Sequence, residues 1–518
     1  TFDDGTSWSR ADVQRMWQEK ALSDDDDYFR GLHGAETLEG GPGDDVITGL
    51  EGDDHYVWTR GDGNDQLIEH GFDGSDTLFL HDVAPGDVTP VREQNDSLVF
   101  VIADTVDGPG ARINLPESLS DSAAGIETFV FDDGTIWTRA ALRDRLLSEA
   151  QTAGADHITG FPSGHETFVF GQGEDTIEGG NGDDTYVWSR GDANVKIVEN
   201  SFGGIDQLIL GDVNSTAVTL REDVDELLVL IADSAPGAAD GGVLRLTGML
   251  TEGVDLGVES IAFADDVVWT KAEILARFVV DQASDAGEYI EGFASDDDLE
   301  GLGGEDVLAG LSGNDTYRWR AGDGNDTINE VRFQGATDVL ELIGVQPGEV
   351  RLEAGYENDL RVVITGAAGP AILTLKNGLV LTNDAGIDVI RFADTGEEWA
   401  TDDFAQILLA TAATPGADSI IGSDEADEIA GLGGNDRMSL GQGGDTYVFR
   451  KGDGRDTYED GGTDGATDTI RIEGYAADEV TFHRLGQDSD DLIIRFSGSD
   501  DAITIPTVCR VMQMPPSR

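Results

Sequence analysis

The sequence predicts a mainly β protein made of four tandem units, each with a short helix, a glycine- and aspartate-rich stretch and a small β-sheet segment. One observation is a tryptophan that closes segments such as FDDGTIW, at Trp8, Trp137, Trp269 and Trp399. Another is a tyrosine in segments such as YVW, at Tyr56, Tyr186, Tyr317 and Tyr447. Successive tryptophans are 129, 132 and 130 residues apart, and successive tyrosines 130, 131 and 130. Two independent series keep one period, so we expect four units, with bounds 1–130, 131–262, 263–391 and 392–518.

The charge balance restricts the classes of partner. The 518 residues include 104 acidic and 32 basic side chains, which gives a net charge of −72. Nucleic acids and anionic membranes require a basic surface, so neither is expected as a partner. A hydrophobic content of 39% does not describe a disordered acidic tail. The excess acid therefore needs a counter-charge, for which divalent cations are the obvious choice.

Cysteine usage and hydropathy exclude two further classes of protein. A single cysteine, Cys509, rules out an internal disulfide framework. No apolar run approaches the roughly 18 residues of a membrane-spanning helix. The chain opens within a motif, TFDDGTSW, without an initiator Met or a visible Sec leader, which is typical of a fragment of a longer polypeptide.

Each unit begins with a helical pattern and ends with strand patterns. The helical patterns are SRADVQRMWQEK, TRAALRDRLLSEAQ, TKAEILARFVVDQ and TDDFAQILLATA. Their N-caps are expected to be Ser9, Thr138, Thr270 and Thr401. Alternating segments such as DQLIL and ELLVLI predict half-buried strands. In the fourth unit the pattern breaks off after AITIP into TVCRVMQMPPSR, and the GIE-type strand of the other units is absent.

Consecutive nine-residue segments lie between the helix and the strands, such as GGPGDDVIT from Gly40 and GLEGDDHYV from Gly49. Glycines at positions one, two and four allow left-handed backbone angles and bring carbonyl oxygens close together. The acid at position six offers a carboxylate, and Ca²⁺ requires six to eight oxygen ligands at roughly 2.3–2.6 Å. The apolar residue at position eight points inward from a very short strand. The second unit departs from this pattern in RGDANVKIV, where Ala193 and Val195 replace a glycine and the acid.

The pattern G-G-x-G-x-D-x-U-x resembles the RTX (haemolysin-type calcium-binding repeat) family. The larger unit resembles the haemolysin-type calcium-binding-related domain that accompanies such repeats. The resemblance covers nearly the whole chain, and it implies a parallel β-roll with Ca²⁺ between neighbouring turns, as well as type I secretion. The fold class is then mainly β with four tandem units, each a short helix, a calcium-filled parallel β-roll and a small β-sheet segment.

The acid at position six of each nonamer is the expected metal ligand, with several Ca²⁺ ions in each unit. These acids are Asp45, Asp54, Asp65, Asp76, Asp156, Asp175, Asp184, Asp206, Asp297, Asp306, Asp315, Asp326, Asp338, Asp418, Asp427, Asp436, Asp445, Asp456 and Asp468. Glu36, Glu166 and Glu288 hold the same position near the start of their runs, where a weaker or capping site is expected. Val195 offers no carboxylate, so the second roll is expected to lose an ion there.

Other interpretations of these segments have less support. A flexible linker does not place an apolar residue at every ninth position. The RGD triplets at Arg60–Asp62 and Arg190–Asp192, typical of integrin ligands, coincide with nonamer positions one to three. The repeated Trp and Tyr residues are expected to pack in the core rather than stack on sugars. No enzyme is expected, because the seven histidines lack a spacing such as HExxH and no G-x-S-x-G elbow is present.

The expected function is calcium binding that drives the folding of a secreted bacterial protein after type I export, in the extracellular space or at the cell surface. Without calcium the carboxylates repel one another, and the 69 glycines carry a large ordering entropy. Two alternatives remain open. One is an adhesin or surface-array segment with a glycan or cell-surface ligand, and the other is the non-catalytic carrier portion of a secreted hydrolase or toxin.

Overall fold

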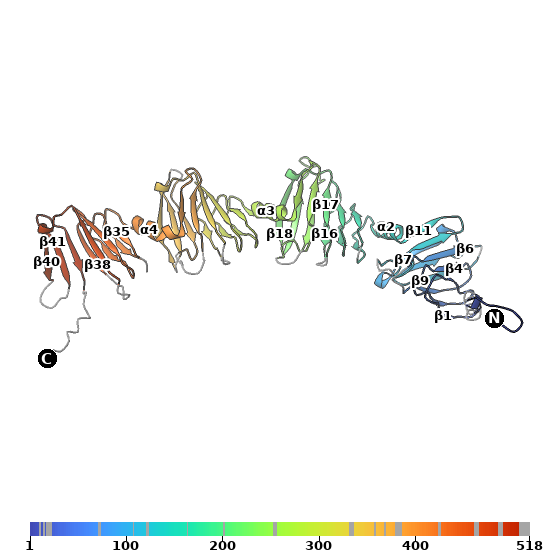
Figure 1. Ribbon diagram of the computed structural model, residues 1–518. Coiled ribbons are helices and arrows are strands. Elements are labelled where there is room, and N and C mark those ends of the chain that lie inside the picture. Colours follow the sequence, from blue (N-terminus) through green and yellow to red (C-terminus); the bar gives the residue numbers. More distant parts are fainter. Residues whose placement is uncertain are drawn as a thin grey trace. The chain divides into compact units, whose positions relative to one another are not determined.

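The structure is a computed structural model that describes the chain except residues 10–11, 14–15, 17–22, 71–73, 107, 121–123, 163, 200–202, 252–255, 331–335, 357–358, 367–368, 379–385, 423–425, 460–465, 485–490 and 507–518. The described residues are mostly strands, with the helices α2 (Arg139–Ala150), α3 (Lys271–Gln282) and α4 (Thr401–Ala412) (Figure 1). The chain divides into two compact units, Thr1–Leu275 and Ala276–Arg518. The prediction of a mainly β protein is confirmed. The anomalous segment TVCRVMQMPPSR lies outside the described residues.

The first repeat consists of two sheets. In spatial order, the six-stranded sheet contains β1 (Tyr28–Arg30), β3 (Val46–Thr48), β5 (Gln66–Ile68), β9 (Ala111–Leu115), β8 (Leu98–Ile102) and β7 (Val88–Arg92). The five-stranded sheet contains β11 (Ile136–Thr138), β10 (Thr128–Phe131), β6 (Thr77–His81), β4 (His55–Thr59) and β2 (Thr37–Glu39). The chain alternates between the two sheets as it runs from β1 to β6, and each strand pairs in parallel with the next strand but one. This path is the parallel β-roll that the family resemblance implies.

The other repeats have the same design. In the second, the sheets are β12 (His157–Thr159), β14 (Asp175–Glu178), β16 (Val195–Val198), β20 (Gly242–Thr247), β19 (Glu226–Ile231) and β18 (Val218–Asp223), and β13 (Thr167–Val169), β15 (Thr185–Val187), β17 (Gln207–Leu210), β21 (Ser260–Phe263) and β22 (Val268–Thr270). In the third, they are β23 (Tyr289–Glu291), β25 (Val307–Ala309), β27 (Thr327–Ile328), β31 (Ala371–Leu375), β30 (Leu360–Ile364) and β29 (Val350–Ala354), and β24 (Asp298–Glu300), β26 (Thr316–Arg320), β28 (Val339–Ile343), β32 (Val389–Phe392) and β33 (Glu398–Ala400). In the fourth, they are β34 (Ser419–Ile421), β36 (Arg437–Ser439), β38 (Arg455–Glu459), β42 (Ala502–Ile505), β41 (Leu492–Phe496) and β40 (Val480–Arg484), and β35 (Glu428–Ala430), β37 (Thr446–Arg450) and β39 (Thr469–Glu473).

Most roll strands are three residues long because glycine turns interrupt the chain at every nonamer. The central residue of such a strand is buried in the roll, as Phe29 is in β1 and Leu38 in β2. These central residues are the apolar residues of nonamer position eight. Longer strands follow the roll and alternate along their length, as in β19, where every second residue is buried.

The predicted sheet segment is continuous with the roll. The strand β20 pairs in parallel with the roll strand β16 and antiparallel with β19, so the hairpin continues the sheet of the roll. On the other sheet β21 continues β17 in the same way. Backbone hydrogen bonds of the last roll strands are thereby satisfied by the strands that follow. Roll and antiparallel strands share one sandwich.

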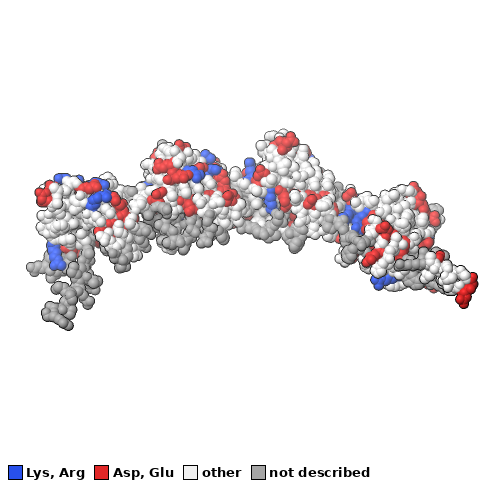
Figure 2. Space-filling model, in the orientation of Figure 1, with Lys and Arg blue, Asp and Glu red and all other residues white. Residues whose placement is uncertain are grey.

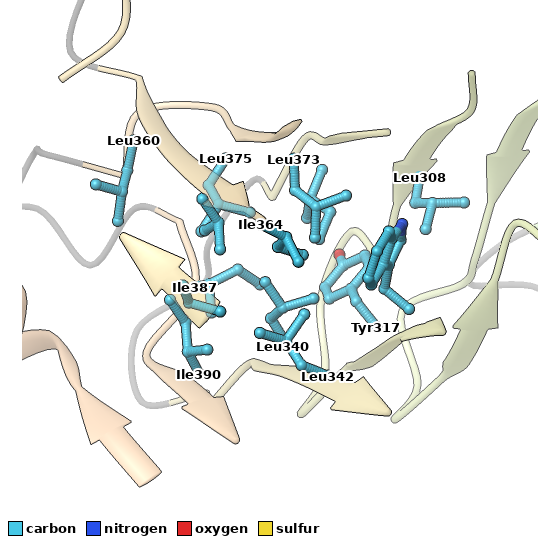
Figure 3. Close-up of a cluster of buried hydrophobic side chains, with 14 of the residues drawn as sticks. Leu308, Tyr317, Leu340, Leu342, Leu360, Ile364, Leu373, Leu375, Ile387 and Ile390 are labelled. Atoms are coloured by element: carbon cyan, nitrogen blue, oxygen red, sulfur yellow. The ribbon is translucent and has the colours of Figure 1, made fainter. Parts of the chain in front are cut away.

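Buried side chains cross from the roll into the antiparallel strands. In the third repeat Leu308 and Tyr317 of the roll belong to the same apolar cluster as Leu360 and Leu373 of the antiparallel strands (Figure 3). None of these four side chains is more than 3% exposed. Full burial of one leucine contributes about 1.5–3 kcal/mol, so this shared core stabilises both parts together.

The helices follow the tryptophan strand, and their caps differ from one another. The Thr138 hydroxyl accepts a hydrogen bond from the Ala141 amide at 3.3 Å, and Thr270 exchanges bonds with Glu273. The prediction of Thr401 as an N-cap is wrong, because α4 begins at Thr401 and the amide of the preceding residue, Ala400, donates to Asp403 instead. The Thr401 hydroxyl is occupied in donating to a backbone carbonyl. Most of the helix predicted after Ser9 lies outside the described residues.

The predicted unit bounds after residues 130, 262 and 391 fall inside the strands β10, β21 and β32. The tryptophan segment forms the next strand and pairs antiparallel with them, as Trp137 does opposite Phe129. Each described tryptophan strand therefore closes the sheet that precedes it. Among the described residues, no helix is both long enough and apolar enough to cross a bilayer.

Candidate metal centre

The acids at nonamer position six lie at the turns, in or directly before the roll strands. Sixteen of the nineteen are buried, and Asp156, Asp418 and Asp468 are half-buried. Figure 2 shows other acidic side chains in scattered groups on the visible surface. Water and salt screen those surface charges, whereas the buried acids lack such screening.

The buried acids form two rows in each repeat. The first row precedes the strands of the six-stranded sheet, and the second row precedes the roll strands of the other sheet. The amide of Asp45 donates to Oδ1 of Asp65 at 2.8 Å in the first row, and that of Asp54 to Oδ1 of Asp76 at 2.8 Å in the second. Such bonds join successive acids in the other repeats over 2.7–3.0 Å. Each carboxylate therefore fixes the turn of the preceding coil.

The second oxygen of several row carboxylates has no hydrogen-bond donor. Buried oxygens without a partner among the described residues include Oδ2 of Asp45, Asp54, Asp184, Asp306, Asp315 and Asp436 and Oε2 of Glu166. A buried anionic oxygen without a partner is strongly destabilising. Carboxylate oxygens are also the ligands that Ca²⁺ prefers, so these residues fit the metal that the repeat pattern implies.

Glycine at nonamer position four allows the coils to stack closely. Gly43 and Gly63 have φ of +149° and +115°, and a side chain on Gly63 would collide with the carbonyl oxygen of Gly43 in the neighbouring coil. Ala193 holds this position in the second repeat and has no positive φ. Val195 pairs with Asp175 and is 2% exposed, so an apolar side chain stands where a carboxylate is expected. The loss of an ion there stays a prediction.

Three clusters combine second-row acids with a glutamate from outside the nonamers. They are Asp54, Glu69 and Asp76; Asp184, Glu199 and Asp206; and Asp315, Glu330 and Asp338. In each cluster one ligand atom from every member lies within 4.8 Å of the others, and all members are buried. The nonamer pattern predicts the aspartates and misses the glutamates. The spacing of the glutamates, 130 and 131 residues, follows the tyrosine series and is the signal that could have identified them.

The recurring position of the tyrosines is explained by these clusters. The Tyr56 hydroxyl donates to Oε2 of Glu69 at 2.7 Å, and Tyr186 and Tyr317 donate to Glu199 and Glu330. Burial, followed by the charge of Glu69, raises the pKa of Tyr56 far above its usual value, so the hydroxyl remains a donor. All four tyrosines of the series are fully buried, as expected for core residues.

Burial also shifts the carboxyl groups of the clusters. It raises the pKa of Asp54 and Asp76 to about 7, with smaller contributions from the neighbouring acids. Burial raises the pKa of Glu199 to about 8 and that of Asp315 to about 7. The protein alone therefore does not supply enough positive charge to keep these carboxyl groups fully ionised at neutral pH.

The second row extends beyond the nonamers. The amide of Asp206 donates to Glu259 at 2.6 Å, and that of Asp338 donates to Asp388 at 2.8 Å. These acceptors are 53 and 50 residues further along the chain and belong to the GIE-type segments. Sequence analysis missed them because sheet pairing alone brings them to the roll.

The first RGD triplet is not presented to a partner. The Arg60 side chain is 1% exposed and pairs with Asp87 at 2.8 Å. Asp62 is buried, and its Oδ2 accepts the amide of Thr59 at 2.7 Å, which closes the local turn. In the second triplet Asp192 accepts the amide of Ser189 in the same way. These residues build the nonamer turn.

Comparison with known proteins identifies two sequence families along the chain. The model of the RTX calcium-binding nonapeptide repeat matches residues 30–57, 163–192, 284–318 and 413–447. The model of the haemolysin-type calcium binding protein related domain matches residues 106–141. No curated protein shows significant similarity to the chain. Among solved structures, the extracellular lipase LipA from Serratia marcescens is 14% identical with a TM-score of 0.11, and the alignment covers 68% of this chain and 36% of the lipase.

Proposed function

We propose that this chain binds Ca²⁺ through both rows of acids and completes its fold only when these rows are loaded with the ion. The chain carries RTX calcium-binding nonapeptide repeats and a haemolysin-type calcium binding protein related domain. The observation that supports this most is the set of buried carboxylate oxygens without a hydrogen-bond donor. The proposed ligands are the position-six acids. Many of them accept a backbone amide with Oδ1, and in several of them Oδ2 has no hydrogen-bond donor among the described residues, including Asp45, Asp54, Asp184, Asp306, Asp315 and Asp436.

The energetics of the rows support coupling between calcium and folding. In the metal-free chain, successive carboxylates in a row repel one another in a water-poor turn. The 69 glycines add a large loss of backbone entropy on folding. Bound Ca²⁺ would supply the positive charge that the turns lack, so its binding free energy becomes folding free energy.

This coupling also supports a secreted location. Extracellular modules typically bind Ca²⁺ at about 10⁻⁴–10⁻³ M, far above the calcium level of a cytosol. The chain would therefore remain largely unfolded before type I export from a bacterium and fold in the extracellular space or at the cell surface. The chain itself has no catalytic role in this proposal, because the two rows account for its buried nonamer acids.

Far-UV circular dichroism of the full chain tests the proposal directly. In excess EGTA the β signal should be weak, and millimolar Ca²⁺ should produce it reversibly. Mg²⁺ at the same concentration should give a much smaller response, because it demands near-octahedral geometry and loses its water reluctantly. A spectrum that Ca²⁺ leaves unchanged would contradict the proposal.

A further inference from the structure

An inserted glutamate follows the last roll strand of the six-stranded sheet in three repeats, and Asp460, which lies outside the described residues, holds this place in the fourth. Glu69 comes directly after β5, and Glu199 and Glu330 hold the corresponding place in the second and third repeats. After the earlier strand β3, this place is taken by Gly49, the first residue of the next nonamer. The insertion interrupts the nine-residue register, so a carboxylate stands where a glycine is otherwise required. All three glutamates lie outside the segments that match the RTX model.

Sheet pairing places each glutamate beside a glycine of the preceding coil. The amide of Gly49 donates to the carbonyl of Ile68 at 3.1 Å, next to Glu69. A side chain on Gly49 would overlap with Glu69, the Tyr56 hydroxyl and Oδ2 of Asp54, the last at 2.6 Å. The bare glycine therefore leaves the space in which Glu69 reaches the two aspartates.

The same arrangement recurs in the next two repeats. A side chain on Gly179 would lie 2.5 Å from Oε1 of Glu199 and 2.8 Å from Oδ2 of Asp184. A side chain on Gly310 would overlap with Asp315 and lie 2.5 Å from the Tyr317 hydroxyl. One glycine, one tyrosine and one inserted glutamate thus recur together.

The aspartates of the clusters carry the evidence for a ligand. Oδ2 of Asp54, Asp184 and Asp315 has no hydrogen-bond partner among the described residues, although each of these three aspartates is at most 1% exposed. Each of these aspartates lies in a cluster with two further buried acids. Three carboxylates without a buried cation beside them would be strongly unfavourable, so the geometry calls for a bound positive charge.

The fourth repeat differs at the glycine and at the described partner of the tyrosine. Leu440, which is fully buried, stands where the other repeats have Gly49, Gly179 and Gly310. Tyr447 there donates to Oδ2 of Asp456 at 2.5 Å rather than to an inserted glutamate. The described residues of this repeat form no cluster of the same kind.

We propose that Glu69, Glu199 and Glu330 are calcium ligands, each completing one site at the end of the second row with two nonamer aspartates. The proposal rests on the proposed function, since it specifies residues that hold the same metal. Two oxygens bound to one Ca²⁺ at about 2.4 Å are at most about 4.8 Å apart, which agrees with the limit within which the ligand atoms of each cluster lie. The tyrosine hydroxyl donates to the glutamate and fixes its orientation.

The test is the number of Ca²⁺ ions bound by the full chain, measured by calorimetric titration and by metal analysis after gel filtration. The variant combines Glu69→Gln, Glu199→Gln and Glu330→Gln, which keep the shape of the side chain and an acceptor for the tyrosine. We expect the loss of three ions per chain, one per cluster, while the remaining sites stay filled. The matched control is Glu51→Gln, Glu174→Gln and Glu305→Gln, which removes the same charge from exposed glutamates in the same three repeats.

A second variant separates a ligand from a purely structural residue. Tyr56→Phe, Tyr186→Phe and Tyr317→Phe remove the hydrogen bond but leave every carboxylate, so the ion count should stay at the wild-type value. If the phenylalanine variant loses the same ions as the glutamine variant, the glutamates act through the tyrosines and the assignment is wrong. An unchanged ion count in the glutamine variant overturns it as well. Failure of the wild-type chain to bind Ca²⁺ at all would instead contradict the proposed function.

Discussion

Arg139 and Glu127 form a 2.6 Å ion pair that connects the start of α2 to the end of the second row in the first repeat. The other carboxylate oxygen of Glu127 accepts the amide of Asp76 at 2.7 Å. Arg139 also donates to the carbonyls of Ser120, Ala124 and Gly125. One guanidinium thus joins the helix, the loop before β10 and the row of acids.

Replacement of Arg139 by Ala should destabilise the calcium-loaded first compact unit by about 1–3 kcal/mol, because a partly buried carboxylate loses its partner. Urea unfolding at saturating Ca²⁺ measures the effect. Arg145→Ala is the control, since Arg145 forms an exposed pair with Glu149 on the same helix, and such pairs contribute about 0.2–1 kcal/mol. Equal losses in the two variants would show that Arg139 has no special role.

Gly49→Ala should weaken calcium binding in the first repeat. The added methyl group would overlap with Glu69, Tyr56 and Asp54, and overpacking of this kind costs about 1–3 kcal/mol. Thermal unfolding at fixed Ca²⁺ should show a lower midpoint. Gly86→Ala provides the comparison, because a methyl group there meets nothing within 4 Å. The bare glycine has no importance if both variants unfold at the wild-type temperature.

Ala193→Gly combined with Val195→Asp should restore an ion to the second repeat. The two changes supply the glycine and the acid found at these positions elsewhere, and Val195 already lies in register with Asp175. Calorimetry should count one more Ca²⁺ per chain, and the added stability should vanish in EGTA, where the new charge repels its neighbours. Val224→Asp adds the same charge at an 85% exposed position and should add no ion. The same count in both variants would refute the prediction.

Calcium affinity should fall as the pH drops below about 7. Burial raises the pKa of Asp54 and Asp76 to about 7 from the ordinary 3.8, so protons compete with Ca²⁺ for these carboxylates. In the calcium-free protein, the folded state holds these protons more tightly than the unfolded state does. The contribution of these groups to the free energy of unfolding is therefore greatest below about pH 3.8, and it is lost as the pH rises through about 7. Titrations at pH 5.5 and pH 8, in buffers of different ionisation enthalpy, should reveal proton release chiefly at the lower pH. Equal calcium affinities at the two pH values would contradict the raised pKa values of Asp54 and Asp76.

Local patterns predicted the residues whose role depends on the nonamer alone. The nine-residue spacing indicates Asp54 because a single turn sets the position of its carboxylate. Glu69 lies outside that register and reaches Asp54 only through the pairing of β3 with β5. Glu127 is 51 residues from Asp76 and depends on the pairing of β6 with β10. Long-range sheet pairing is the property that a pattern within one nonamer does not contain.

Local sequence patterns also do not determine the helix caps or the end of each sandwich. Ala400, not Thr401, holds the place of Thr138 and Thr270 directly after the repeated tryptophan, and it is the N-cap of α4. Its amide donates to Asp403, while the Thr401 hydroxyl donates to a backbone carbonyl. Trp137 begins a new period in the sequence and closes the preceding sheet in the structure. Periodicity gives the length of the repeat, whereas hydrogen bonding decides where one sandwich ends.

The strand β1 ends the six-stranded sheet of the first repeat and is only three residues long. Four consecutive aspartates, Asp24–Asp27, directly precede it. A free sheet edge is a template on which another chain can add a strand and begin an aggregate. This edge offers few backbone groups to such a chain, and its carboxylates repel a second copy that carries the same acidic sequence. The short strand and the aspartates before it therefore make this edge a poor template for strand addition.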